Sequence, residues 1–335
     1  MVGVGSGCGR CTVGERCRGA NGRAGAESDE RLGRTCASSK RGETLWVTWR
    51  TITMSAFGPA LITIFRLILK MIKNVIKAAL DRNKFSVMFR KVIKRFEKNT
   101  HSEATVWAKS QIRASLGEFC DAVDSSLWAE TLVACEKIKK DSDATLKQIP
   151  CELVARYLLG GGNYPLLYFL VRKYRPNVVI ETGVAAGWST KTISDALDKN
   201  GTGELYSSDF PYFRIENPEK YIGVLVSDEQ KDKWKLDTRG DTLALPSFLS
   251  VIGDAKVNLF HYDSDKSYSG RSFAIDLIEP RFSRDAIFVV DDIQDNLHFR
   301  DYVRTRKLAY EVFEFEGKYV GLVKGVGEQV LPHNV

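Results

Sequence analysis

Acidic residues and glycines that follow apolar runs are the residues of this chain most able to do chemistry. An apolar run at 178–180 ends in Glu181, and Gly183 and Gly187 follow it, four residues apart. A strand that turns tightly into a helix amino terminus is the geometry at which nucleotide-like cofactors bind. Later apolar runs end in the same way, at Asp209, Gly240-Asp241, Asp263-Ser-Asp-Lys266 and Asp291-Asp292. This repetition favours one ligand-binding edge over unrelated turns.

Seven apolar segments that alternate with helical patterns are predicted to carry these acids. Such alternation is typical of a mostly parallel sheet with helices on both faces, a doubly wound α/β fold. Only Glu316-Gly317 separates the last two segments, which predicts a terminal antiparallel hairpin. The predicted strands are 177–183, 203–209, 234–239, 257–263, 286–291, 309–315 and 318–324. A short helix is expected at 166–174, ended by Arg175-Pro176.

The order of these motifs resembles the class I S-adenosylmethionine-dependent methyltransferases from about residue 150 to 326. The nearest groups are the small-molecule O-methyltransferases of the catechol and macrocin types and a related broad bacterial group. The resemblance implies a Rossmann-like sheet, S-adenosylmethionine as cofactor and a small-molecule acceptor. In that family E-x-G-x-x-x-G follows the first strand, and Glu181-Thr-Gly-Val-Ala-Ala-Gly187 matches it.

The resemblance also assigns the cofactor-binding residues. Gly183 and Gly187 let the backbone approach the methionine part of the cofactor, with Ser189 just beyond, and Glu181 orients the loop or meets the cofactor amine. Asp209 would accept both ribose hydroxyls, as acids do in dinucleotide folds. Asp241 corresponds to the adenine-edge position.

In the metal-dependent branch of the family, Asp263, Asp291 and Asp292 hold one divalent cation. Converging carboxylates repel unless a cation compensates them, and an all-oxygen ligand set suits Mg²⁺. Because neighbouring strand residues point to opposite faces, Asp291 and Asp292 both reach the ion only if the chain turns there. Capping of a loop, or pairing with Arg271 or Lys266, is the alternative for these acids.

Two residues are candidate bases for the acceptor hydroxyl. Lys266 stands where the broad bacterial group has His and the catechol type has Lys, and a nearby cation can lower the pKa of a lysine. His298, in the predicted loop after the acidic pair, is its rival.

The charge of +7 is unevenly distributed over the 335 residues. Residues 1–100 hold 20 Lys and Arg against 7 Asp and Glu, whereas the remaining 235 hold 29 against 35. The acidic half shows no basic stripe, so nucleic acid is not the expected partner. Seven cysteines, an odd number without a secretory signal, indicate a reducing, cytoplasmic setting. Cys8-x-x-Cys11 has no second pair to complete a zinc site.

Four regions are expected along the chain. Residues 1–53 are rich in Gly, Arg and Cys and are predicted to be disordered, as a leader before Met54. Residues 54–100 predict basic amphipathic helices, because Arg66, Lys70, Lys73 and Lys77 fall in one arc opposite a wide apolar face. These helices either lie on an anionic membrane surface through 55–98 or pack on the domain. Residues 101–150 predict a helical cap or an oligomerisation layer, and 151–330 the methyltransferase domain.

The sequence therefore predicts an enzyme, an O-methyltransferase that uses S-adenosylmethionine and Mg²⁺ on a small molecule. One alternative is a non-catalytic, membrane-associated scaffold with the same fold. A second, an NAD-dependent oxidoreductase, lacks the G-x-G-x-x-G spacing and has no place for the metal acids.

Overall fold

The computed structural model describes residues 59–80, 88, 97–149, 161–210, 212–213 and 216–330. The predicted leader at 1–53, with Cys8 and Cys11, lies outside the described residues, and so does nearly all of the second basic segment at 81–96.

The described residues contain one seven-stranded sheet in the order β3-β2-β1-β4-β5-β7-β6. β1 to β5 run parallel, and β7 lies antiparallel between β5 and β6. The fold class predicted from the sequence is thereby confirmed, including the terminal hairpin. The strands are β1 (Val178–Thr182), β2 (Glu204–Ser208), β3 (Trp234–Asp237), β4 (Val257–Tyr262), β5 (Phe282–Val290), β6 (Glu311–Phe315) and β7 (Lys318–Lys324).

The strand boundaries follow the apolar runs, and β5 departs most from expectation. It begins at Phe282, four residues before the predicted start at 286, because Phe282 is buried and pairs with Val257 of β4. The intervening Arg284 and Asp285 are exposed and concealed this start in the sequence.

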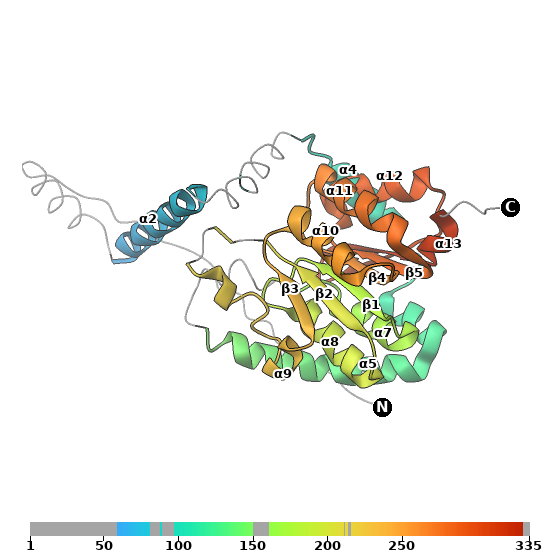
Figure 1. Ribbon diagram of the computed structural model, residues 1–335. Helices are drawn as coiled ribbons and strands as arrows, with labels where there is room; N and C mark the ends of the chain where they lie inside the picture. The colour runs from blue at the N-terminus through green and yellow to red at the C-terminus, as the bar shows by residue number, and fades with distance from the viewer. Residues whose placement is uncertain are drawn as a thin grey trace, which may run out of the picture. The chain divides into compact units, whose positions relative to one another are not determined.

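Helices cover both faces of the sheet (Figure 1). One face carries α7 (Tyr164–Tyr174) and α8 (Trp188–Asn200), with the long α5 (Leu116–Leu146) packed beneath α7. The other carries α10 (Asp241–Ile252), α11 (Tyr268–Ile278) and α12 (His298–Thr305), joined by α4 (His101–Ser110). The remaining pieces are α2 (Pro59–Ala79), α9 (Asp228–Lys231), α13 (Val326–Val330) and the short 3-10 turns η1 (Pro218–Lys220), η2 (Glu279–Arg281) and η3 (Ile293–Asp295).

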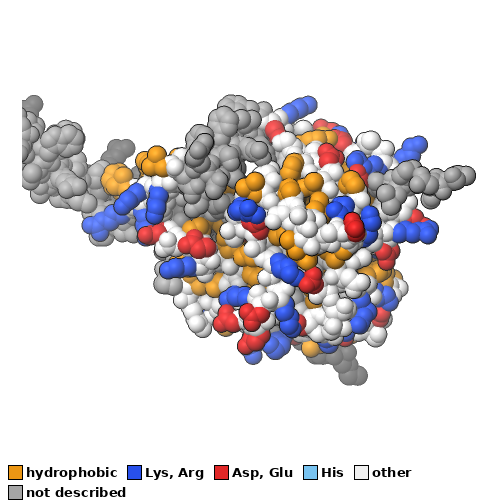
Figure 2. Space-filling model, viewed as in Figure 1, with side chains coloured by type: hydrophobic (Ala, Val, Ile, Leu, Met, Phe, Trp, Pro, Cys, Tyr) orange, Lys and Arg blue, Asp and Glu red, His pale blue; other side chains and the backbone are white. Residues whose placement is uncertain are grey.

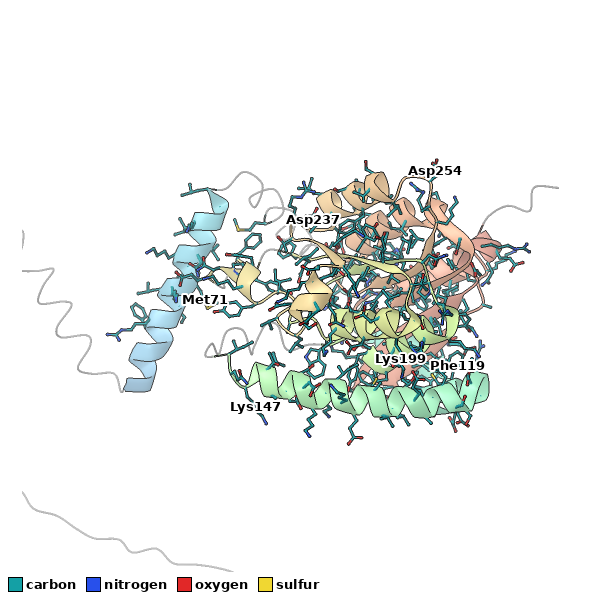
Figure 3. The ribbon with its side chains drawn as sticks, turned by 60° about the horizontal axis from the view of Figure 1, so that its bottom comes forward. Met71, Phe119, Lys147, Lys199, Asp237 and Asp254 are labelled. Atoms are coloured by element: carbon teal, nitrogen blue, oxygen red, sulfur yellow. The ribbon has the colours of Figure 1, made fainter. Side chains whose placement is uncertain are left out.

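Alternating residues of each strand build two separate cores, one on each face. Val179 and Leu259 pack toward α5, α7 and α8, whereas Ile180 and Phe260 pack toward α10 and α11. In Figure 3, Phe119 and Lys147 mark the two ends of α5, and Asp254, just after α10, lies on the opposite side of the sheet. The helices predicted over 101–150 are thus divided: Trp107 of α4 belongs to one core and Cys135 of α5 to the other.

Local signals in the sequence set the helix ends that flank the site. The Asn163 side chain accepts a hydrogen bond from the Leu166 N–H and caps α7, and Arg175, at φ 49°, ends it as predicted. The order of the strands reverses between β1 and β4. The connections that leave the carboxyl ends of these two strands therefore diverge, and a crevice lies between them. Ligands of open α/β sheets bind at such a switch point.

Candidate active site

The loop between β1 and α8 is held by a fully buried carboxylate. Glu181 Oε2 accepts hydrogen bonds from Thr190 Oγ1 of α8 and Ser207 Oγ of β2, each at 2.7 Å. These bonds tie the first strand to its neighbour and to the helix that follows. Of the two roles considered for Glu181, this geometry favours orienting the loop. Ser189 lies in the first turn of the same helix and is also buried.

Gly183 is required by the packing of two strand ends. Its φ is +85°, and a Cβ there would lie 2.5 Å from the carbonyl oxygen of Asp263. Gly187 caps α8 at φ +101°, with Gly223 3.0 Å from its missing Cβ. The glycine pattern is therefore explained first by close approach of protein backbone, before any cofactor is considered.

Replacing Gly183 by alanine is expected to lower the free energy of unfolding by about 3 kcal/mol, since strain at positive φ adds to a backbone clash. Gly201→Ala is the matched control: its φ is +70°, but no described atom lies within 4 Å of the missing Cβ. The control should cost about 1 kcal/mol. Urea unfolding of both variants measures the difference, and equal losses would contradict the packing argument.

Asp209 follows β2 and faces this glycine loop. Its Oδ2 accepts a hydrogen bond from the Ala185 N–H at 2.8 Å, and Oδ1 accepts one from the Phe210 N–H. The side chain is only 2% exposed. Burial raises its pKa to about 7, although the two backbone bonds oppose the rise. A buried carboxylate beside the cofactor loop is where a ribose acceptor is expected.

Asp241 is the first residue of α10 and connects two strand ends. Its carboxylate accepts hydrogen bonds from Ser208 Oγ at 2.7 Å and Ser264 Oγ at 2.5 Å. The predicted cofactor residues Glu181, Asp209 and Asp241 thus line neighbouring strand ends, as the sequence implied.

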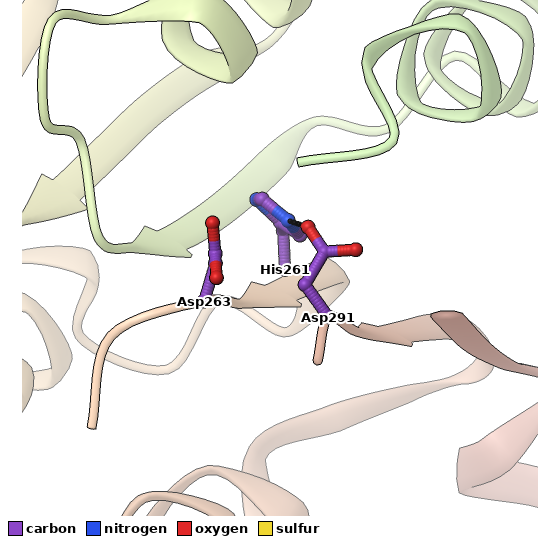
Figure 4. A group of neighbouring side chains, drawn as sticks. All are labelled: His261, Asp263 and Asp291. Carbon is purple, nitrogen blue, oxygen red and sulfur yellow. Dashed lines mark hydrogen bonds and ion pairs between the residues drawn. The ribbon is translucent and has the colours of Figure 1, made fainter. Parts of the chain in front are cut away.

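A second group of side chains lies at the ends of β4 and β5 (Figure 4). His261, Asp263 and Asp291 can each bring one ligand atom within 4.8 Å of the others. His261 Nε2 is 2.8 Å from Asp291 Oδ2, and Nδ1 is 3.7 Å from Glu181 Oε1. Burial lowers the pKa of His261, but the bonds to Asp291 and Glu181 outweigh it and raise that pKa to about 10. The sequence analysis did not assign His261 any role.

Asp292 follows Asp291 directly but makes a different set of contacts, of which it shares Lys266 with Asp263. It adopts φ 52° and ψ 40°, so the chain turns immediately after Asp291. Its carboxylate meets Lys266 Nζ at 2.7 Å, Gln294 Nε2 at 3.2 Å and Lys318 Nζ at 3.4 Å. The group that can hold a metal ion therefore contains His261 in place of the predicted Asp292.

Lys266 forms ion pairs with both Asp263 and Asp292. Burial works against its charge, yet the two carboxylates prevail and raise its pKa above the ordinary value. The sequence argument expected a lowered pKa, so the shift here runs in the direction opposite to that of a general base.

His298 is the first residue of α12 and is buried, contrary to its prediction as a loop residue. Its ring lies 4.9 Å from that of Tyr268 and 6.4 Å from that of Tyr302. Burial, followed by the charge of Arg271, lowers the pKa of His298 to about 4. This residue is neutral at pH 7 and enclosed by aromatic rings.

Two further residues fix this part of the site: Arg271, considered in the sequence only as a partner of the acidic side chains, and Gly162, which was given no role. Arg271 of α11 is fully buried, and its Nη2 donates to the carbonyl oxygens of Asp291 at 3.2 Å and Asp292 at 2.7 Å. Gly162 lies over the pair of His261 and Asp291: a Cβ there would overlap Asp291 Oδ2. Arg271 lies in a buried segment, where apolar residues are expected. A charged residue at such a position was the signal that the sequence offered.

A pocket of about 250 Å³ lies elsewhere, where α8 ends and β2 and β3 begin. Gly203, Leu205, Lys233 and Trp234 are among its lining residues, and none of the predicted site residues is. It is at the amino ends of the strands, away from the switch point.

Comparison with known proteins agrees with this geometry. Residues 180–293 match a family described as a methyltransferase domain. A comparison with curated protein sequences gave no match. Solved structures similar to this chain include the methyltransferase PaMTH1 of Podospora anserina (12% identity over 60% of this chain and 96% of that one, TM-score 0.43). Others are an O-methyltransferase from Bacillus cereus (13%, 65% and 99%, 0.39) and TomG from Streptomyces achromogenes (16%, 63% and 99%, 0.37).

The matched segment runs from β1 to η3 and so contains every acid discussed above. This match agrees with the methyltransferase resemblance of the sequence, and the sheet order agrees with the fold that the resemblance implied.

Proposed function

We propose that the protein transfers the methyl group of S-adenosylmethionine to a hydroxyl oxygen of a small molecule. The observation that carries this proposal is the meeting of two groups at one switch point. Glu181, Asp209 and Asp241 surround the glycine loop, and Asp263 lies beside it through the contact with Gly183. A cofactor site and an acidic acceptor site therefore adjoin.

The reaction is an in-line displacement in which positioning supplies most of the rate. The acceptor oxygen bonds to the methyl carbon, the carbon–sulfur bond breaks with its electron pair going to sulfur, S-adenosylhomocysteine leaves, and the hydroxyl proton of the acceptor passes to water. Lys266, kept protonated by Asp263 and Asp292, presents positive charge where the acceptor oxygen becomes anionic. We assign it this electrostatic role in preference to that of a base.

A divalent cation fits the charge of this site. Asp263 and Asp291 are converging carboxylates, and Asp291 Oδ1 is buried without a hydrogen-bond partner among the described residues. When bound there, a cation would lower the pKa of the acceptor hydroxyl. Asp263 and Asp291 would hold it, and Gly162 would shield it from water.

Calorimetric titration of S-adenosylmethionine into the full chain, with Mg²⁺ and then with EDTA, tests the proposal. Binding is expected in both conditions, followed by transfer of labelled methyl to members of a panel of catechols, sugars and lipid-linked hydroxyls. Binding without transfer to any acceptor would favour the scaffold alternative. Absence of binding by folded protein would contradict the cofactor assignment.

We further propose that α2 holds the enzyme at an anionic membrane surface. Its 21 residues include no acid, and Arg66, Lys73 and Lys77 are exposed. Five apolar side chains of the helix are about half exposed: Phe65, Ile68, Leu69, Ile72 and Ile76. None of the helices among the described residues has the length and apolarity to cross a bilayer. A basic, amphipathic helix suits the interface.

Sedimentation with vesicles of phosphatidylglycerol is expected to capture the full chain, while neutral phosphatidylcholine vesicles capture much less. Replacing Lys73 and Lys77 by glutamine should weaken binding by about 30-fold, at about 1 kcal/mol per charge. Lys233→Gln together with Lys235→Gln, on the domain surface, is the matched control. Figure 2 shows basic and acidic side chains interspersed over the face of the molecule that it displays. Lys233 and Lys235 each pair with an acid, Asp198 and Glu204, which predicts little effect of the control. Equal capture by both vesicle types would contradict the proposal.

A further inference from the structure

Three buried side-chain atoms at the carboxyl ends of β1, β4 and β5 have no hydrogen-bond partner among the described residues. They are Glu181 Oε1, His261 Nδ1 and Asp291 Oδ1. Glu181 and His261 are completely buried, and Asp291 is 3% exposed. Glu181 Oε1 and His261 Nδ1 face each other at 3.7 Å, whereas Asp291 Oδ1 has no such neighbour. Buried polar atoms are nearly always paired, so Asp291 Oδ1 in particular indicates that something else binds there.

The spacing of the cluster suits a metal ion. His261, Asp263 and Asp291 each offer one atom within 4.8 Å of the others (Figure 4). Two ligands on opposite sides of an ion, each about 2.1 Å from it, are about 4.2 Å apart, so small side-chain rotations suffice. His261 and Asp263 are two residues apart at the end of one strand and therefore share a face.

Asp292 is unsuited to complete this set. Its carboxylate is occupied by Lys266, Gln294 and Lys318, and the turn that begins after Asp291 directs it toward them. Lys266 pairs with Asp263 as well, so a cation at the strand ends would displace this lysine in either case. Gaining Asp292 would in addition require displacing Gln294 and Lys318. His261, by contrast, lies on β4, which leads into Asp263, and its Nε2 already meets Asp291 Oδ2 at 2.8 Å.

We infer that a divalent cation at this site is held by His261 together with Asp263 and Asp291, a nitrogen–oxygen–oxygen set. This inference deepens the metal-assisted part of the proposed function. An imidazole ligand favours Mn²⁺ or Co²⁺ over Mg²⁺, which prefers oxygen ligands alone. Whichever ring nitrogen binds the ion, the other has a carboxylate neighbour, Glu181 or Asp291. Such a neighbour is the usual outer partner of a ligating histidine.

Binding of Mn²⁺ to the full chain, followed by electron paramagnetic resonance, tests this ligand set. We expect one bound Mn²⁺ per chain and a ¹⁴N coupling in the electron spin echo modulation. Labelling the histidines with ¹⁵N should replace that coupling by the ¹⁵N one. This measurement uses the unaltered protein and so does not depend on the folding of a variant. Bound Mn²⁺ without nitrogen coupling, or no binding at all by folded protein, would overturn the inference.

Two variants add an independent readout of affinity. His261→Asn should weaken Mn²⁺ binding by at least about tenfold, since even outer partners of a metal contribute that much. Asp292→Asn should leave the affinity nearly unchanged, and the reverse pattern would also overturn the inference. Failure here is distinguishable from failure of the proposed function. If methyl transfer persists in EDTA and no Mn²⁺ binds, the metal site is excluded and the methyltransferase activity stands. If nitrogen-coupled Mn²⁺ binds but no methyl is transferred, the activity is excluded and the metal site stands.

Discussion

Asp209→Ala is expected to weaken binding of S-adenosylmethionine by about 100-fold or more. The carboxylate is proposed to accept two ribose hydroxyls, and hydrogen bonds to a charged group contribute about 1.5–3 kcal/mol each. It also holds the Ala185 N–H, so its loss loosens the loop that receives the methionine part. Calorimetry measures the change directly. Equal affinity in wild type and variant would exclude Asp209 as the ribose acceptor.

Asp209→Asn separates the cofactor role of this residue from its effect on stability. The folded protein raises the pKa of Asp209 from 3.8 to about 7, so stability falls as pH rises between these values. The loss in the free energy of unfolding is complete above pH 7 and amounts to about 4 kcal/mol. The asparagine variant should therefore melt higher than wild type without cofactor, by more at pH 8 than at pH 5. Its cofactor affinity should nevertheless be lower, because the amide is uncharged.

The raised pKa of Asp209 also predicts a pH dependence of cofactor binding. Wild-type affinity should weaken as pH falls below about 7, because protonated Asp209 is a poorer acceptor. Asp209→Asn should lack this dependence. A variant with the wild-type pH profile would show that another group is responsible.

Asp263→Asn is expected to leave cofactor affinity nearly unchanged while turnover falls roughly 100- to 1,000-fold, the loss typical of one electrostatic contact in a transition state. Asp263 meets the cofactor loop through its backbone, since its N–H donates to the Thr182 carbonyl at 3.0 Å and its carbonyl lies against Gly183. Its side chain faces Lys266 and the metal ligands instead.

Steady-state rates with a saturating acceptor, alongside calorimetry of S-adenosylmethionine, check this separation. Asp254→Asn serves as the control, because this exposed acid lies in the turn after α10, remote from the strand ends (Figure 3). Loss of cofactor affinity in Asp263→Asn would place the carboxylate in the cofactor site and contradict the assignment.

The strands and the position of the acids at their ends could be predicted because each signal is local. An apolar run followed by an acid or a glycine indicates a strand end, and parallel strands bring such ends together. His261 was missed because a single polar residue within Leu259–Tyr262 is readily taken for part of a buried strand. Its spacing of two residues from Asp263 was nevertheless a usable signal.

The metal set and the base depended on features that a sequence pattern does not contain. The left-handed backbone of Asp292 decides which acids meet, and no motif encodes that angle. The proximity of Lys266 to the acids was predicted, but the direction of its pKa shift follows from two short ion pairs. Likewise, the burial of His298 results from packing against Tyr268 and Tyr302.

Arg271 has a consequence for how this site can be altered or transferred. Its buried guanidinium donates hydrogen bonds to the two carbonyl oxygens at the bend that orients Asp291 and Asp292. Arg271 belongs to α11, which follows β4, whereas the bend follows β5. Asp263, Asp291, Asp292 and Lys266 therefore cannot be transferred to another protein as a sequence motif alone. Transferring them to another sheet would reproduce the sequence motif without the Arg271 hydrogen bonds that orient it. Redesign for new acceptors should keep the Arg271 hydrogen bonds and vary the residues that surround the site.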